Sequence, residues 1–243
     1  MTRARVQLEP AWVLRAAPYR DTSLLLECLS RDRGRVGVVA RGARGPKSRS
    51  RALLQAFRPL LLSWTESGDL GTLTAVEAAG APLNLAGERV FSGWYLNELL
   101  LRLLQRHDAH AQVFEAYGDA IAALAVDAGP GEAGLRRFEL RLLAELGFGL
   151  ELPLDLHADR TYRLDLETGL QEVAGDHREA LRGAHLIALR DNALSSEDAL
   201  RAARRLLRAA LAPLLGARPL ASASMLRELR LRRIAAPRGL SAG

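Results

Sequence analysis

Cysteine and lysine are almost missing from this sequence of 243 residues, since Cys28 and Lys47 are the only residues of their kinds. A single cysteine excludes both an internal disulfide and a thiolate cage for zinc. No uninterrupted apolar run approaches the roughly 18 residues that a membrane span needs. The first residues, "MTRARVQLEP", are charged where a signal peptide would be apolar. We therefore expect a cytoplasmic protein without a membrane segment.

Signatures of catalytic sites are missing as well. The stretch "GARGPKS", residues 42–48, is similar to a phosphate-cradling loop, but Pro46 stands where such a loop needs a glycine with a free N–H. The sequence has no Gly-x-Ser-x-Gly elbow and no His-Glu-x-x-His pair, and its scattered carboxylates specify no acid/base pair. His107 and His110 lie at the end of a helix candidate, in an expected exposed loop. We therefore expect a binding protein without a cofactor rather than an enzyme.

Basic residues are concentrated in one segment. Residues 31–58 contain one acid and nine basic residues, a local charge of +8 in a chain whose net charge is +6. Because Lys47 is the only lysine, nearly all of this charge is guanidinium, which can fork onto phosphate and stack on bases. One-sided charge of this kind is typical of a surface that meets a polyanion, and a solubilising loop is the alternative.

Five short β-prone runs separated by turn residues occupy the first third of the chain. They are residues 11–16, 22–30, 35–41, 58–66 and 71–78. Five strands in so short a segment, with the longest connection between the third and the fourth, predict a closed barrel of the oligonucleotide-binding (OB) type. An SH3-like barrel is the main rival on this pattern alone.

A helical pattern follows the barrel. Apolar spacing predicts helices over residues 90–107, 113–126 and 134–149, and a last long helix that opens at Ser195 and ends near residue 211. Residues 160–173 alternate around the turn "ETG" and predict a β-hairpin. The predicted fold class is α+β: an OB-fold domain over residues 1–80, then a mainly helical domain over residues 81–243 with a hairpin region near 153–175.

The third predicted helix has one apolar stripe. Leu135, Phe138, Leu142 and Leu146 follow 3, 4, 4 spacing, which places them on one side of a helix. Glu139 projects close to this stripe, so we expect it to pair with a basic side chain.

The sequence resembles the bacterial RecO family of recombination mediators. The resemblance rests on "PYRDTSLLLECLSRDRGRVGVVARGARGPKSRSRALLQAFRPLLLSW", "WYLNELLLRLL", "LRRFELRLLAELGFGLEL" and "GARPLASASMLREL", in the family's order and spacing. The first block is the specific one, and together the blocks cover nearly the whole chain. The resemblance implies binding of single- and double-stranded DNA and annealing of complementary strands. It also implies cooperation with RecR to load the recombinase RecA onto DNA coated by single-strand binding protein.

One departure from the family concerns zinc. Some members carry a four-cysteine zinc site between the third and the last long helix, where "LELPLDLHADRTYRLDLETGLQEVAGDH" contains no cysteine. The chain resembles the zinc-free branch, so we expect no metal. Packing of Tyr162, Leu164 and Leu166 would then hold the hairpin.

Two groups of residues are candidates for binding. In the barrel, basic side chains would neutralise phosphates and Tyr19 would stack on bases, whereas Trp12 and Trp64 are expected in the core. The candidates for DNA binding are Arg31, Arg33, Arg35, Arg41, Arg44, Lys47, Arg49, Arg51 and Tyr19. For the acidic, hydrophobic tail of single-strand binding protein, we expect a groove at Phe138 and Leu142 whose rim is Arg136, Arg137 and Arg141.

Two other functions remain open on the sequence. An OB barrel with a basic turn also suits RNA, and a basic loop can meet an acidic protein partner without binding DNA.

Overall fold

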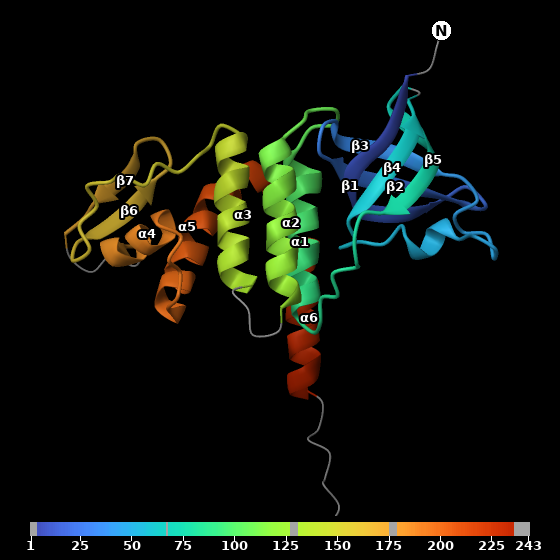
Figure 1. Ribbon diagram of the computed structural model, residues 1–243. Coiled ribbons are helices and arrows are strands. Elements are labelled where there is room, and N and C mark those ends of the chain that lie inside the picture. Colours follow the sequence, from blue (N-terminus) through green and yellow to red (C-terminus); the bar gives the residue numbers. More distant parts are fainter. Residues whose placement is uncertain (1–3, 67, 127–130, 175–178, 236–243) are drawn as a thin grey trace, which may run out of the picture.

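The computed structural model describes residues 4–66, 68–126, 131–174 and 179–235. Its first part is a closed five-stranded barrel, which stands at one end of the molecule, beside a row of helices (Figure 1). The strands of the barrel are β1 (Arg5–Tyr19), β2 (Ser23–Ser30), β3 (Gly34–Ala40), β4 (Leu60–Thr65) and β5 (Leu70–Ala78).

The strand order of the barrel is β1-β2-β3-β5-β4, with β3 and β5 parallel and the other paired strands antiparallel. Alternate side chains of each strand point inward and form one apolar core, which includes Leu26, Val38, Leu62 and Trp64. The longest connection joins β3 to β4 and contains the short 3-10 helix η1 (Ser50–Ala52). The predicted OB fold is therefore confirmed.

The first strand is longer than predicted. β1 begins at Arg5 and pairs with β4 through its first half and with β2 through its second half. Two irregularities, between Val6 and Glu9 and between Val13 and Arg15, bend it around the barrel. The apolar pattern did not predict this extension, because polar residues stand at the start of β1.

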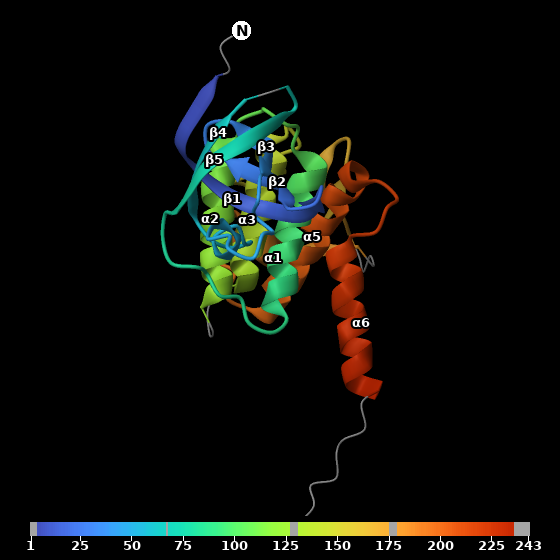
Figure 2. The same ribbon diagram turned by 90° about the vertical axis from the view of Figure 1, so that its right-hand side faces the viewer.

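The rest of the structure is helical, with one small sheet. Its helices are α1 (Arg89–Leu103), α2 (Ala111–Ala125), α3 (Gly131–Glu145), α4 (Gly183–Arg190), α5 (Glu197–Leu215) and α6 (Ala221–Ala235). Strands β6 (Thr161–Asp165), β7 (Gly169–Glu172) and β8 (Leu181–Arg182) form a sheet in the order β7-β6-β8. Figure 2 looks along the molecule from the barrel, with the helices behind it. The predicted α+β class is confirmed, and the division at residues 80 and 81 stays a prediction.

Several details of this part differ from the predictions. The long helix α5 is capped by Ser196, whose hydroxyl accepts a hydrogen bond from Ala199 N, and it continues through Pro213 to Leu215. Helices α4 and α6 were not predicted. In the hairpin region, described here as far as residue 174, Tyr162 is buried and Leu164 packs on the core, but Leu166 is 61% exposed because it precedes the turn.

A buried polar cluster joins α1 to α3. Glu139 is 1% exposed and pairs with Arg136 (3.1 Å), which confirms its predicted basic partner, and Tyr95 donates its hydroxyl proton to Glu139 (2.6 Å). Burial and the Glu139 carboxylate raise the pKa of Tyr95, so this hydroxyl keeps its proton. One cation and one hydroxyl donor therefore hold this buried carboxylate.

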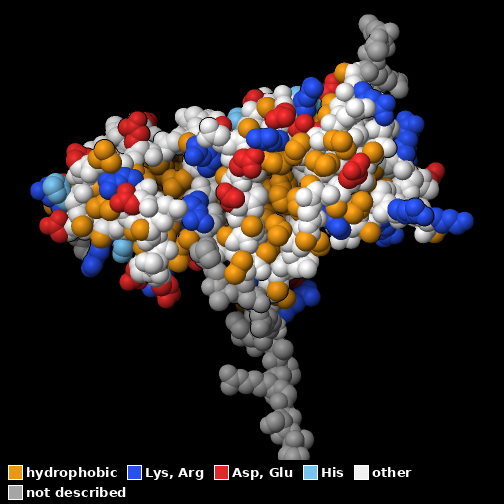
Figure 3. All heavy atoms as spheres, viewed as in Figure 1, with side chains coloured by type: hydrophobic (Ala, Val, Ile, Leu, Met, Phe, Trp, Pro, Cys, Tyr) orange, Lys and Arg blue, Asp and Glu red, His pale blue; other side chains and the backbone are white. Residues whose placement is uncertain are grey.

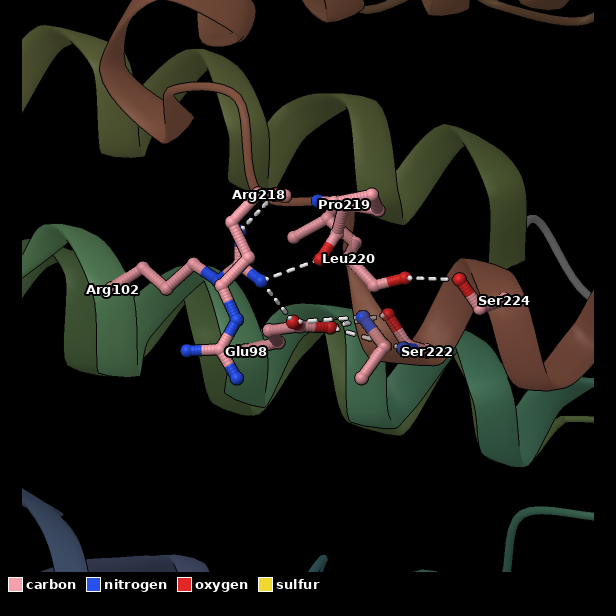
Figure 4. A network of polar contacts seen from close by, with 8 residues as sticks. Glu98, Arg102, Arg218, Pro219, Leu220, Ser222 and Ser224 are labelled. Carbon is pink, nitrogen blue, oxygen red and sulfur yellow. Dashed lines mark hydrogen bonds and ion pairs between the residues drawn. The ribbon is translucent and has the colours of Figure 1, made fainter.

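Helix α6 is attached to α1 by Glu98 (Figure 4). This carboxylate accepts hydrogen bonds from Ala221 N (2.9 Å), Ser222 N (3.0 Å) and the Ser222 hydroxyl (2.9 Å), so a side chain of α1 caps α6. Arg102 bonds Glu98 (2.8 Å) and the carbonyl oxygens of Arg218 and Pro219 (both 2.7 Å). Burial opposes ionisation of Glu98, but these bonds outweigh it and lower its pKa. Further along, α6 extends below the body of the protein (Figure 1).

Replacing Glu98 by glutamine is expected to loosen α6, because the amide keeps one acceptor oxygen but places an NH2 donor against an N–H group that needs an acceptor. The loss of these bonds corresponds to about 1–3 kcal/mol locally, so tryptic cleavage at Arg227 should accelerate roughly tenfold. Glu172→Gln, at an exposed ion pair with Arg160, is the control. Because folding lowers the pKa of Glu98, its bonds to α6 stabilise the folded protein fully at pH values above the ordinary pKa of a glutamate. This stabilisation is lost as the pH falls through the lowered pKa of the folded state. Equal cleavage of both variants would contradict the assignment.

Candidate nucleic-acid interface

The connection between β3 and β4 presents five cations to solvent. Ala43 and Leu54 are buried in the barrel core and anchor this connection at two points. The charged side chains between and beside these anchors are exposed, and η1 starts where the Ser48 hydroxyl accepts a hydrogen bond from Arg51 N (3.3 Å). The exposed cations, here called the loop cations, are Arg41, Arg44, Lys47, Arg49 and Arg51.

The loop cations have no acidic partner. Residues 41–51 contain no Asp or Glu, and no ion pair joins a loop cation to a carboxylate anywhere in the part of the chain that the structure describes. Figure 3 shows Lys and Arg side chains gathered at the end of the barrel that is farthest from the helices. Their field is therefore available to an external anion.

Arg44 ties this loop to the turn between β1 and β2. Its backbone N–H donates to the carbonyl oxygen of Thr22 (2.8 Å), and its guanidinium donates to those of Arg20 (3.2 Å) and Asp21 (3.4 Å). The turn thus lies beside the loop, and it brings Arg20, which the sequence analysis did not select. The signal for Arg20 was its place in the hairpin turn at the same end of the barrel as the loop.

Tyr19 lies at this end of the barrel and is half-buried. The guanidinium of Arg20 lies over its ring, 5.3 Å from the ring centroid. Trp12 and Trp64 are 6% and 2% exposed, so their predicted place in the core is confirmed, and Phe57 is buried too. Of these four aromatic residues of the barrel, only Tyr19 is at the surface.

The three arginines around the turn between β2 and β3 have acidic partners. Arg31 pairs with Glu115 of α2 (3.1 Å), Arg33 with Glu66 (3.7 Å) and Arg35 with Glu27 (3.4 Å). They lie at the opposite end of the barrel, next to the helices. The structure therefore separates the predicted DNA-binding cations into five without a carboxylate partner among the described residues and three with one.

The predicted rim on α3 is only partly exposed. Arg136 is 6% exposed and paired with Glu139, so it is not accessible to a ligand. Phe138 and Leu142 are 1% and 0% exposed, because α3 is packed between α2 and α5, and they line no groove. The other two rim residues are exposed: Arg137 donates to Asn192 (3.1 Å) and Arg141 to Gln112 (2.5 Å).

Histidines and carboxylates make no metal site among the described residues, which leave out His177. His110 lies at the start of α2, 3.3 Å from Asp108 and 3.6 Å from Glu145, whereas His107 is exposed. Burial raises the pKa of Cys28 to about 12, so its thiol is protonated. Within the same residues, no helix is long and apolar enough to cross a membrane.

Comparison with known proteins covers nearly the whole chain. The family model "Recombination protein O N terminal" matches residues 5–81, and "Recombination protein O C terminal" matches residues 85–158. The DNA repair protein RecO of Alkalilimnicola ehrlichii is 45% identical over 238 residues, which are 94% of this chain and 94% of the relative. Those of Nitrosococcus oceani and Coxiella burnetii are 44% and 42% identical, over 93% and 91% of this chain and 95% and 98% of the relatives. This chain therefore belongs to the RecO family, with an OB barrel, a helical part and a role in DNA repair and recombination.

Proposed function

We propose that this protein is a non-catalytic recombination mediator of the cytoplasm that binds single- and double-stranded DNA and anneals complementary strands. With RecR, it would help to load RecA onto DNA coated by single-strand binding protein. The observation that carries the proposal is the set of five exposed loop cations without a carboxylate partner among the described residues, at the end of an OB barrel. Such a set can neutralise phosphates without reading base sequence.

Annealing follows from the same charge. Two complementary strands repel each other through their phosphates, and a shared cationic surface reduces this repulsion and raises their local concentration. The protein needs no bond-making chemistry for this step. Tyr19, beside the loop cations, would stack on an unpaired base.

The affinity of the protein for an oligonucleotide of single-stranded DNA is expected to depend steeply on salt. If the loop cations neutralise about five phosphates, log affinity should fall with log salt with a slope near −3.5. Fluorescence anisotropy of a labelled oligothymidylate, titrated at several salt concentrations, measures this slope. A slope near zero would contradict the proposal.

Strand annealing in the presence of single-strand binding protein tests the mediator role directly. The protein should accelerate annealing of complementary strands that are coated by that protein. The two alternative functions have their own outcomes: an RNA-binding module would prefer RNA in a competition between matched RNA and DNA strands, and a partner of acidic proteins would bind DNA weakly at any salt concentration.

The tail of single-strand binding protein would bind at Arg137 and Arg141. Both guanidiniums are exposed and bonded to neutral side chains, Asn192 and Gln112. A carboxylate can replace these amide acceptors and form stronger, charge-assisted hydrogen bonds. One turn of α3 separates the two arginines, so one acidic peptide can contact both.

Replacing both Arg137 and Arg141 by glutamate should weaken binding of a peptide with the tail's sequence about tenfold or more, because charge-assisted bonds are lost and like charges are introduced. Affinity for bare DNA should stay unchanged. Anisotropy of a labelled tail peptide measures the first quantity, and the oligothymidylate titration the second. The control is Arg160→Glu with Arg163→Glu, next to and on strand β6; unchanged tail affinity in the α3 variant would remove the assignment.

A further inference from the structure

In OB folds, the face formed by strands 2 and 3 commonly binds oligonucleotides, together with the loops after strands 1 and 4. Because Leu26 and Cys28 of β2 and Val36 and Val38 of β3 fill the barrel core, their sequence neighbours point outward. Pairing of β2 with β3 sets these neighbours opposite one another in three rows. The rows are Leu25 with Val39, Glu27 with Gly37, and Leu29 with Arg35.

Helices α1 and α2 cover the part of this face next to β1. Leu29 is 0% exposed and belongs to the apolar core of the helices. Trp12 of β1 has its ring centroid 5.4 Å from that of Tyr117 and 6.4 Å from that of Phe114. Asn97 of α1 donates to the carbonyl oxygen of Leu14 (2.9 Å) and accepts from the Tyr117 hydroxyl (2.7 Å). Barrel and helices therefore share one core at this face.

The connection between α1 and α2 covers the middle of the face. Arg106 forms a bridge with Arg35 and an ion pair with Glu27, and His107 N donates to the Arg35 carbonyl oxygen (2.9 Å). Gly37 leaves room for this arginine, since a Cβ there would lie 3.0 Å from its guanidinium. A Cβ on Gly34 would lie 1.9 Å from the carbonyl oxygen of Asp108. Two glycines thus allow the connection to lie directly on β3.

A strand of DNA on this face would have to displace these contacts. Removing the helices would expose Trp12, Leu14 and Leu29, which are 6%, 5% and 0% exposed, and would leave Glu27 without Arg106. The loop end of the barrel needs no such opening, because its loop cations are already exposed and the Arg44 bonds hold the turn beside them. Of these two surfaces, only the loop end is therefore both positively charged and accessible.

We propose that this barrel binds the phosphate backbone of single-stranded DNA at its loop end, across the turn between β1 and β2 and the loop cations. The face of β2 and β3 serves as a permanent joint to the helices. Arg106 and Glu27 are positioning residues that keep this joint closed. This placement rests on the proposed DNA-binding function and specifies the surface that performs it.

The variant Arg106→Gln tests the placement, because it removes the ion pair across the joint and leaves Glu27 paired with Arg35. Its affinity for oligothymidylate should stay within about twofold of the unsubstituted protein, with the same salt slope. If DNA bound the face after opening of the joint, a weaker joint would populate the open state and raise the affinity. If Arg106 itself contacted phosphate, both affinity and slope would fall. Either change would overturn the placement.

Hydrogen exchange of the unsubstituted protein with and without oligothymidylate gives a second measurement, which does not depend on the folding of a variant. Added protection is expected in residues 19–22 and 41–54 and none in residues 25–29 and 35–39. The reverse pattern would overturn the placement and leave the proposed function standing. Failure of the unsubstituted protein to bind oligothymidylate would overturn the proposed function, and the placement with it.

Discussion

Replacing Lys47, Arg49 and Arg51 by glutamate is expected to lower the affinity for single-stranded DNA about 50-fold at about 0.15 M salt, and about 500-fold at about 0.05 M. These side chains are exposed and have no carboxylate partner among the described residues, so each is free to replace a counterion on the DNA. Arg44 is left in place because its guanidinium holds the turn between β1 and β2. The substitution thus removes charge and keeps the shape of the loop end.

The size of this effect follows from counterion release. Each phosphate contact to a single strand adds about −0.7 to the slope of log affinity against log salt, so three lost contacts should change the slope from about −3.5 to about −1.4. The plots of log affinity against log salt for the unsubstituted protein and the variant meet near 1 M salt, where released counterions no longer favour binding. The loss of affinity is therefore largest at low salt, and repulsion by the new carboxylates adds to it.

The matched control replaces Arg160, Arg163 and Arg201 by glutamate, which makes the same change in net charge. Arg160 and Arg201 already pair with Glu172 and Asp198, and all three lie in the helical part. This variant should keep the slope and most of the affinity, and annealing should fail in the loop variant alone. Equal losses in the two variants would show that net charge, and not the loop end, governs binding.

The location of the loop cations was predictable because it depends on local sequence. A run of arginines without acids, between two β-prone segments, has no nearby carboxylate to neutralise it. The acidic partner of Arg31 was not predictable from local sequence, whereas Glu27, the partner of Arg35, lies on the neighbouring predicted strand. Glu115, the partner of Arg31, is 84 residues away, and the packing of α2 on the barrel alone brings the two together.

The helix α3 shows a second limit of sequence patterns. One apolar stripe was visible, and Leu135, Phe138 and Leu142 are indeed buried. Because α2 and α5 both pack on α3, the buried surface is wider than the stripe and includes Arg136 and Glu139. Arg136 and Arg137 are adjacent in sequence, and the turn of the helix buries the first and exposes the second.

Replacing Arg136 by methionine is expected to lower the free energy of unfolding by roughly 3–5 kcal/mol at pH 8, because it leaves the Glu139 carboxylate buried without a cation. Glu139 would keep only the hydrogen bond from the Tyr95 hydroxyl (2.6 Å). Methionine fills a similar volume, so a cavity contributes little to the loss. Urea unfolding at pH 8 and pH 5 measures the change.

The loss should be smaller at pH 5. Burial raises the pKa of Glu139 above its ordinary value of 4.5, while Arg136 and Tyr95 act against this rise. Without Arg136 the pKa of the folded state rises further. Between the unfolded and the folded pKa, the folded protein binds more protons than the unfolded chain, so stability falls as the pH rises through this window. At pH 5 the Arg136→Met variant therefore buries a Glu139 carboxyl group that is more fully protonated than at pH 8. The desolvation penalty is correspondingly smaller.

Two variants separate the buried charge from other effects of the substitution. Arg136→Met combined with Glu139→Gln removes both charges and keeps an acceptor for the Tyr95 hydroxyl, so it should regain most of the lost stability, and its advantage over Arg136→Met should be larger at pH 8 than at pH 5. Arg137→Met, on the exposed side of the same helix, should change the free energy of unfolding by less than about 0.5 kcal/mol. If the double variant were as unstable as Arg136→Met, the loss would come from packing around residue 136. The buried carboxylate would then have no special need for its arginine.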